Sequence, residues 1–158
     1  MNPKEPLTLQ GKLELEKELE TLIKVDREEI KKSISEAREL GDLKENAEYH
    51  SAKEKQALIE GQIGQLQGVL ANSETIDVTK ISADKVVFGA TVTLYDPEKD
   101  KTHVYKVVGA QEADLSKGKI SYKGPLGKAL LQKEEGDEVV VKAPKGDVIY
   151  EIESFEYK

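Results

Sequence analysis

The sequence predicts an α+β fold, in which an N-terminal antiparallel α-helical coiled-coil hairpin is followed by a small domain with a mostly antiparallel sheet. Three observations support this prediction. Apolar residues recur at coiled-coil spacing between residues 8 and 70, and no proline interrupts residues 7–96. From residue 76 onward, short runs rich in β-branched residues alternate with turn residues. We therefore expect two domains, residues 1–75 and residues 76–158.

The first helix is expected to be continuous over residues 8–40, with Thr8 as its N-cap. Its apolar stripe has two parts that are offset from each other by one residue. Gly41 stands where a glycine commonly follows the end of a helix. The stripe consists of Leu15, Leu19 and Leu22 in the first part, and of Ile23, Ile30, Ile34 and Ala37 in the second.

The second helix is expected from about Leu43 to Leu70, because residues on one face step alternately by three and four. A connection as short as Gly41-Asp42 would make the two helices antiparallel neighbours. The predicted product is a thin rod whose tip lies near residues 40–46. The stripe consists of Tyr49, Ala52, Gln56, Ile59, Ile63, Leu66 and Leu70.

The C-terminal half has the pattern of a small sheet domain. A turn is expected at residues 96–100 and one short helix at residues 126–132. The strand candidates are residues 86–88, 91–95, 104–108, 120–122, 138–142 and 148–157.

The charge of the chain argues against nucleic acid as its main partner. The net charge is −7, with 11 Lys and Arg against 17 Asp and Glu in residues 1–79. A protein held by phosphates usually needs a positive field. We therefore predict a protein partner and weak binding to free duplex DNA. We also expect a monomer.

Composition excludes several other classes. The absence of cysteine excludes disulfides, thiolate catalysis and a cysteine zinc site, and His50 and His103 show no ligand spacing. The N-terminus lacks the apolar core of a signal peptide, and no apolar run approaches the roughly 20 residues of a membrane helix. We expect a soluble, cytoplasmic protein without a membrane partner.

Two carboxylates at the predicted tip, Asp42 and Glu45, allow two interpretations. Asp-x-x-Glu at a helix start is close to a capping box, in which Asp42 accepts from the Glu45 amide. Alternatively, hard oxygen ligands on a rod tip can complete a Mg²⁺ site whose other ligands come from a partner. The spacing alone favours capping, but a cap would also fix the geometry of the same carboxylates, so both interpretations can hold together.

Residues 36–50, which read EARELGDLKENAEYH, strongly resemble the tip motif of the GreA family of bacterial transcript cleavage factors. The resemblance runs nearly end to end and keeps the family's order. Its other segments are Leu7-Thr8 with Gly11, Ile76-Asp77-Val78, and residues 88–92, 112–114, 120–121, 125–131 and 133–137.

The resemblance implies a coiled-coil hairpin with an FKBP-like C-terminal domain that docks at the secondary channel of RNA polymerase. The hairpin would enter the channel, where Asp42 and Glu45 would help hold a second Mg²⁺ jointly with the polymerase active site. The polymerase would then cleave its own backtracked RNA, so the factor would not be a nuclease by itself.

The resemblance also suggests roles for other residues. Lys53 matches a position that contacts the RNA 3′ region, and Lys55 lies nearby, although a solvated helix face is the alternative for both. Pro125 matches a docking-loop proline, and a turn proline is an equally good interpretation. For Tyr49, packing is favoured over chemistry. The chain departs from the family at Gly124, Lys128 and Gln132, where Ser, Arg and Gly are common.

Three other functions remain as alternatives. A non-catalytic coiled-coil adaptor would use the tip acids only as a cap. A prolyl isomerase is disfavoured, because an apolar proline pocket is hard to build from residues 80–158. They contain no Trp and just two Phe. A polymerase-binding relative that inhibits would need an altered tip, whereas this acidic tip is intact.

Overall fold

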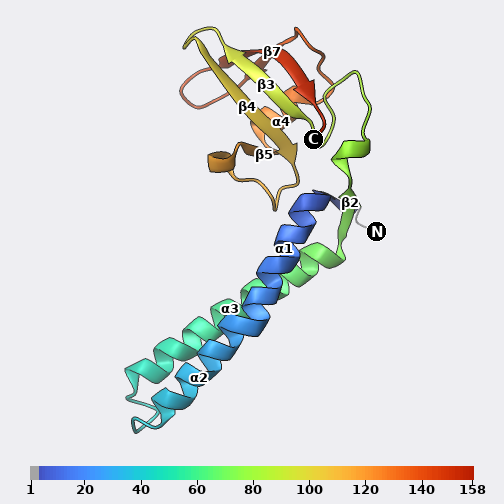
Figure 1. Cartoon of the computed structure of the whole chain (residues 1–158). Helices are drawn as coiled ribbons and strands as arrows, with labels where there is room; N and C mark the ends of the chain where they lie inside the picture. The colour runs from blue at the N-terminus through green and yellow to red at the C-terminus, as the bar shows by residue number, and fades with distance from the viewer. Residues whose placement is uncertain (1–3) are drawn as a thin grey trace. The chain divides into compact units, whose positions relative to one another are not determined.

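The structure is a computed structural model that describes residues 4–158. It divides into two compact units, one made of residues 4–11 with residues 73–158 and the other made of residues 12–72 (Figure 1). The segment before Lys12 therefore groups with the C-terminal part of the chain. We call the two the small unit and the hairpin unit, and describe each by itself.

The hairpin unit contains most of helix α1 (Leu9–Thr21), then η1 (Leu22–Asp26), α2 (Arg27–Arg38) and α3 (Ala47–Ala71). Helices α2 and α3 form an antiparallel helical hairpin (Figure 1). Most residues of both predicted apolar stripes meet along the seam between the helices. Arg27 and Glu60 add a two-pronged ion pair across the seam, with N–O distances of 2.8 and 2.9 Å. The buried residues of the seam are Leu22, Ile30, Ile34, Ile59 and Ile63, flanked by Leu19, Ile23, Tyr49, Ala52 and Leu66.

The prediction of one continuous α-helix over residues 8–40 is wrong in the middle, where η1 is a π-helix. The Arg27 amide donates to the Leu22 carbonyl, five residues back. A π-turn accommodates one extra residue in an α-helix, and η1 coincides with the one-residue offset in the apolar stripe. The local widening keeps Leu22 and Ile30 on the same buried seam.

The small unit begins with a strand that the sequence patterns did not predict. β1 (Glu5–Thr8) pairs in parallel with β2 (Ser73–Ile76), so the two chain segments that flank the hairpin are hydrogen-bonded to each other. Thr8 still caps α1 as expected, because its hydroxyl oxygen accepts from the Gly11 amide at 3.0 Å. The strand therefore ends where the helix starts.

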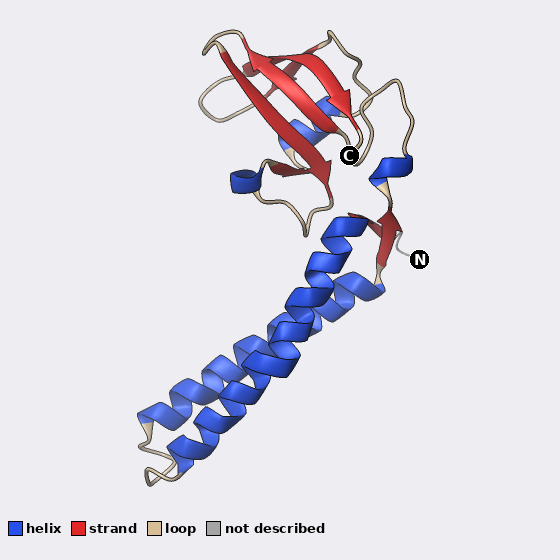
Figure 2. Ribbon diagram, viewed as in Figure 1, coloured by secondary structure: helices blue, strands red, loops and turns tan. Residues whose placement is uncertain are grey.

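The main sheet of the small unit has five strands in the order β5-β4-β3-β7-β6, of which only β4 and β5 pair in parallel. The predicted α+β fold class, with its mostly antiparallel sheet, is confirmed. Figure 2 shows α4 (Pro125–Leu130) against one face of the sheet. The strands are β3 (Thr91–Asp96), β4 (Lys101–Val108), β5 (Lys119–Ser121), β6 (Glu138–Val141) and β7 (Val148–Glu156), with 3-10 turns η2 (Val78–Lys80) and η3 (Leu115–Lys117).

Two local predictions in the small unit need correction. Residues 86–88 form no strand; the Val86 amide donates to the Lys133 carbonyl and its carbonyl accepts from the Gln132 amide. Val86 is fully buried, so its β-branched side chain fills the core from a loop. The helix expected over residues 126–132 ends at Leu130, because Leu131 is extended and Gln132 is left-handed with φ 69°.

Among the described residues 4–158, no helix has both the length and the apolar character needed to cross a membrane.

Candidate functional site at the hairpin tip

The tip loop comprises residues 39–46, between α2 and α3. Its end is set by Asn46, whose side-chain oxygen accepts from the Tyr49 amide at 3.0 Å and whose side-chain nitrogen donates to the Ala37 carbonyl at 2.5 Å. The prediction that α3 starts near Leu43 with Asp42 as its cap is therefore wrong. The Asn46 side chain caps α3 through its oxygen and bonds the end of α2 through its nitrogen. An ionised aspartate could accept the first hydrogen bond, but it has no side-chain proton to donate in the second.

Asp42 and Glu45 both lie in the tip loop and are exposed. One Asp42 carboxylate oxygen accepts from the Lys44 amide at 2.9 Å, which is a local turn contact. Within residues 4–158, Glu45 makes no hydrogen bond or ion pair, so the expected capping box is absent. Most of the lone pairs of these two carboxylates therefore face solvent and are available to an external ligand.

The tip acids do not make a metal site by themselves. In the described part of the chain, no group of three or more His, Asp or Glu side chains is arranged to hold a metal ion. One or two carboxylates completed by water and phosphate oxygens is nevertheless the ligand set that Mg²⁺ commonly uses in phosphoryl chemistry. Asp42 and Glu45 therefore fit the carboxylate ligands of a Mg²⁺ site whose other ligands come from elsewhere.

Two leucines beside the acids were not singled out from the sequence. Leu40 is 66% exposed and Leu43 is 42% exposed, so neither side chain belongs to the hairpin seam. The sequence signal that could have identified them is that two leucines flank Gly41-Asp42 and neither belongs to an apolar stripe. Two apolar side chains are therefore exposed on either side of Asp42 in the tip loop.

The loop is held by residues at the start of α3. The Tyr49 ring packs against the hairpin seam, with the Arg38 guanidinium 5.7 Å from its centroid. His50 donates from its Nε2 to the Lys44 carbonyl at 3.2 Å and makes an edge contact with Tyr49. The predicted packing role of Tyr49 is confirmed, and His50 serves to restrain the loop.

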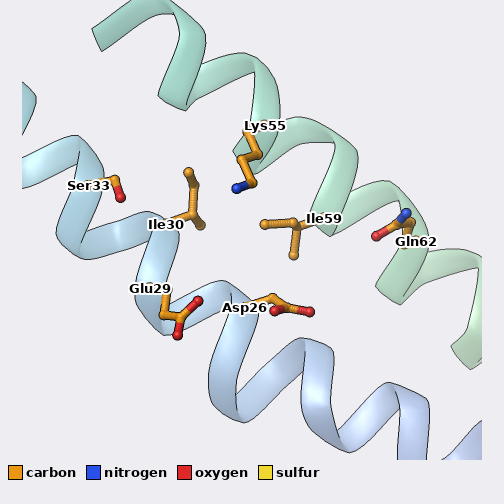
Figure 3. A pocket seen from close by; sticks show the side chains of 7 residues that line it. All are labelled: Asp26, Glu29, Ile30, Ser33, Lys55, Ile59 and Gln62. Atoms are coloured by element: carbon orange, nitrogen blue, oxygen red, sulfur yellow. The ribbon is translucent and has the colours of Figure 1, made fainter. Parts of the chain in front are cut away.

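Lys53 and Lys55 have different surroundings on α3. Lys53 donates to Gln56 at 3.2 Å on an exposed face. Lys55 lines a cavity of about 310 Å³ between α2 and α3, opposite the carboxylates of Asp26 and Glu29 (Figure 3). The floor of that cavity is formed by Ile30 and Ile59, and Ser33 and Gln62 complete its lining.

Pro125 is an exposed residue at the first position of α4, where proline is well tolerated. Gly124 precedes it as an N-cap without a side-chain hydrogen bond. Residues 124–127 line a groove of about 280 Å³ together with residues 113–115 and 119–121. Three segments that are separate in the sequence thus form one surface around Pro125.

Comparison with known proteins assigns the chain to a class. A model of the N-terminal region of transcription elongation factors matches residues 5–75, and a model of the C-terminal region of GreA/GreB transcription elongation factors matches residues 80–157. The chain therefore belongs to the GreA/GreB family of transcription elongation factors.

A relative that matches over the full chain agrees with this assignment. The chain is 49% identical over 158 residues to the transcription elongation factor GreA of Francisella tularensis subsp. novicida (strain U112), covering 99% of each chain. Among solved structures, it is similar to Gfh1 of Thermus thermophilus, with 28% identity, coverage of 97% and 99%, and a TM-score of 0.45. It is also similar to a GreA/GreB factor from Nitrosomonas europaea, with 22% identity, coverage of 99% and 100%, and a TM-score of 0.43.

Proposed function

We propose that this elongation factor binds RNA polymerase and stimulates the polymerase's own Mg²⁺-dependent cleavage of backtracked nascent RNA, which rescues arrested complexes. The observation that carries the proposal is the pair of exposed carboxylates, Asp42 and Glu45, in the tip loop. Neither of them caps α3. Family membership supports the same activity. The chain supplies ligands for chemistry that is completed by its partner.

Asp42 and Glu45 would each offer carboxylate oxygens to a second Mg²⁺ whose remaining ligands come from the polymerase and the RNA phosphate. When bound, that ion would supply charge stabilisation for the attacking and leaving oxygens of phosphodiester hydrolysis. The role of the tip loop is to hold the two carboxylates without consuming their lone pairs. Asn46 performs the capping that would otherwise occupy Asp42.

The other proposed contacts follow from where charge and grooves lie. Lys53 and Lys55 would contact the 3′ region of the RNA, and Lys53 is the stronger candidate because Lys55 shares its cavity with two acids. The small unit would dock at the secondary channel through the groove around Pro125. The factor would act as a monomer, and in a bacterium it would work with the polymerase in the cytoplasm.

The direct test adds the purified protein to stalled elongation complexes that carry end-labelled RNA. We expect shortened RNA only when polymerase, Mg²⁺ and the factor are all present. Incubation of the factor with naked RNA and Mg²⁺ is the control, because the tip holds too few ligands to act alone. Robust cleavage of naked RNA would contradict the proposal that the factor assists the polymerase.

A coiled-coil adaptor without a chemical role is the second candidate, and the exposed Leu40 and Leu43 favour it. An adaptor would bind polymerase and leave RNA cleavage unchanged. The stalled-complex experiment separates the two candidates, because binding without shortened RNA supports the adaptor.

Free duplex DNA is not proposed as a target, because the net charge is −7. Binding at about 0.15 M salt should be no tighter than the roughly 10⁻⁴–10⁻⁶ M Kd of non-specific binders. A titration that gives submicromolar affinity would contradict this expectation.

A further inference from the structure

The start of α1 is attached to the small unit through one carboxylate, that of Glu112 in the loop after β4. One of its oxygens accepts from the backbone amides of Thr8 and Gly109, each at 3.0 Å. The other oxygen accepts from the Thr8 hydroxyl, whose oxygen in turn accepts from the Gly11 amide. We call Thr8, Gly11, Gly109 and Glu112 the Glu112 cluster.

Both glycines in the Glu112 cluster provide space that a side chain would fill. A Cβ added to Gly11 would overlap the Glu112 carboxylate, and a Cβ added to Gly109 would overlap the Pro6 carbonyl. By contrast, a Cβ on Gly64 in α3 would meet no atom within 4 Å. Since glycine in a helix costs conformational entropy relative to alanine, the close approach of the carboxylate gives a physical reason for Gly11.

The other end of β1, at Glu5, is also bonded to the rest of the small unit. The Glu5 carboxylate accepts from the Lys123 ammonium and from the Tyr122 hydroxyl, each at 2.6 Å. The hydrogen bond from Lys123 is the main cause that holds the pKa of the Glu5 carboxyl below its ordinary value. Tyr122 and Lys123 directly precede Gly124 and Pro125, so the start of β1 is bonded to residues next in sequence to the groove around Pro125.

Burial strengthens this attachment. Leu7 is 1% exposed and Thr8 is 2% exposed, so the end of β1 is part of the interior of the small unit. Residues 9–11 of α1 belong to that unit, and the helix continues without interruption into the hairpin unit at Lys12. The first turn of α1 is therefore one of the two places where the chain passes between the units, the other being Asn72-Ser73.

We propose that Glu112 is a positioning residue for transcript cleavage. By bonding Thr8 it holds the first turn of α1 within the unit that docks, and α1 leads from that turn into the hairpin unit. The proposal rests on the proposed function, since it assigns Glu112 a role in delivering Asp42 and Glu45. Glu112 itself contacts neither the RNA nor the metal.

The first test uses full-length variants with stalled elongation complexes at saturating factor. Glu112→Ala and Gly11→Ala should each reduce the rate of RNA cleavage at least about fivefold, while the Kd for polymerase stays within about twofold. The double variant should lose no more than either single variant, because both changes break one cluster. Gly64→Ala is the matched control for an added methyl group in a helix and should retain the full rate.

A conservative pair at Thr8 separates positioning from folding. Thr8→Ser keeps the hydroxyl that joins Glu112 to Gly11, so it should retain cleavage, whereas the nearly isosteric Thr8→Val should lose it to the same extent as Glu112→Ala. Hydrogen exchange should show faster exchange of the Gly11 amide in Thr8→Val, with unchanged protection of the sheet. Asp96→Asn is the control for a changed turn contact elsewhere in the small unit, because the Asp96 side chain accepts from the Glu98 and Lys99 amides in the turn that follows it.

The outcomes are distinguishable from those that test the proposed function. If the parent protein fails to stimulate cleavage, the proposed function is wrong. If the parent stimulates and both Glu112→Ala and Thr8→Val keep the full rate, the positioning role is wrong. It is also wrong if these variants lose polymerase binding in proportion to cleavage, since Glu112 would then serve docking or folding alone.

Discussion

The hairpin unit and the small unit bury their apolar side chains in different ways. The sheet of the small unit surrounds a core in which Leu94, Val92 and Ile152 are completely buried. The hairpin seam is a single line of contacts between helices, with Ile63 as its most buried member at 2% exposure. A core enclosed on all sides cannot relax easily, whereas a seam open along both edges can.

The carboxylates compared between the two units also differ, in the number of hydrogen bonds that they accept within the fold. In the small unit, Glu112 accepts three hydrogen bonds from two amides and a hydroxyl, and Glu5 accepts two from a hydroxyl and an ammonium group. At the tip of the hairpin unit, Asp42 accepts one local amide and Glu45 has no partner within the described residues. Carboxylates that bond several parts of a unit hold that unit together, and carboxylates with few partners remain available for an external cation. The comparison therefore separates acids that anchor the fold from acids that have few partners within it.

The largest expected effect contrasts the two cores. Leu94→Ala should lower the free energy of unfolding by about 3–5 kcal/mol, and Ile63→Ala by about 2–3 kcal/mol, because the seam can partly collapse onto the lost volume. Urea titration followed by circular dichroism measures both. Leu58→Ala is the control, because Leu58 is 69% exposed and should change stability by no more than about 0.5 kcal/mol. Equal losses at Leu94 and Ile63 would show that the seam packs as tightly as the sheet core.

The next effect is on chemistry and should leave stability unchanged. Asp42→Asn and Glu45→Gln should each reduce cleavage stimulation at least about tenfold, which corresponds to about 1.4 kcal/mol of transition-state stabilisation. Polymerase binding and the melting temperature should persist, since α3 is capped by Asn46. Raised Mg²⁺ should partly restore the rate. Glu48→Gln, in the first turn of α3, is the matched control. Full cleavage stimulation by the Asp42→Asn, Glu45→Gln double variant would contradict a role of the tip acids in cleavage and would favour the adaptor function.

A smaller effect is expected where the tip loop joins the hairpin. Asn46→Ala removes the cap of α3 and the bond to Ala37, so it should destabilise the hairpin by about 1–2 kcal/mol. Asn46→Asp keeps the cap acceptor but loses the donor, and should cost about half as much. Thermal melting by circular dichroism compares the variants. An Asn46→Asp variant as unstable as Asn46→Ala would show that the bond to Ala37 dominates.

The smallest effect concerns the backbone at Gln132, whose φ of 69° is unusual for a residue with a side chain. Gln132→Gly should stabilise the small unit by about 0.5 kcal/mol, because the relief of left-handed strain slightly exceeds the entropy cost of glycine in the unfolded chain. Asp100→Gly is the control at φ 51°, where the lost side chain also bonds the Tyr95 hydroxyl at 2.6 Å. A gain at Asp100 equal to that at Gln132 would contradict this explanation.

Patterns along the chain were sufficient for much of the fold. The stripe on α3 follows from a repeat of three and four residues, and its members are buried or half-buried in the hairpin seam. The strands near residues 91–95 and 104–108 follow from β-branched alternation. The offset in the first stripe also marked the place of η1, although a shift of register does not by itself reveal a π-turn. These features depend on neighbours within one turn or one strand.

The choice between possible caps at the tip could not be made locally. Asp42 and Asn46 are both good capping residues, and each precedes an apolar residue by a few positions. The bond from Asn46 to Ala37 selects the later start, and it exists only because α2 ends beside α3. The sequence therefore predicted that Asp42 and Glu45 lie at the tip, as the structure has them, but it predicted the wrong local geometry around them.

By itself, the sequence determined the helical hairpin, most strands of the sheet and the position of the acidic tip, because periodicity and turn residues act over short separations. Only the tertiary structure decided the pairing of β1 with β2, the burial of Val86 from a loop and the bonds of Glu112 to Thr8. Each of these joins residues that are tens of positions apart, and closing such loops is favourable only when the whole unit packs. A carboxylate's partners are decided at that stage, and so is whether it anchors the fold or stays free for a metal.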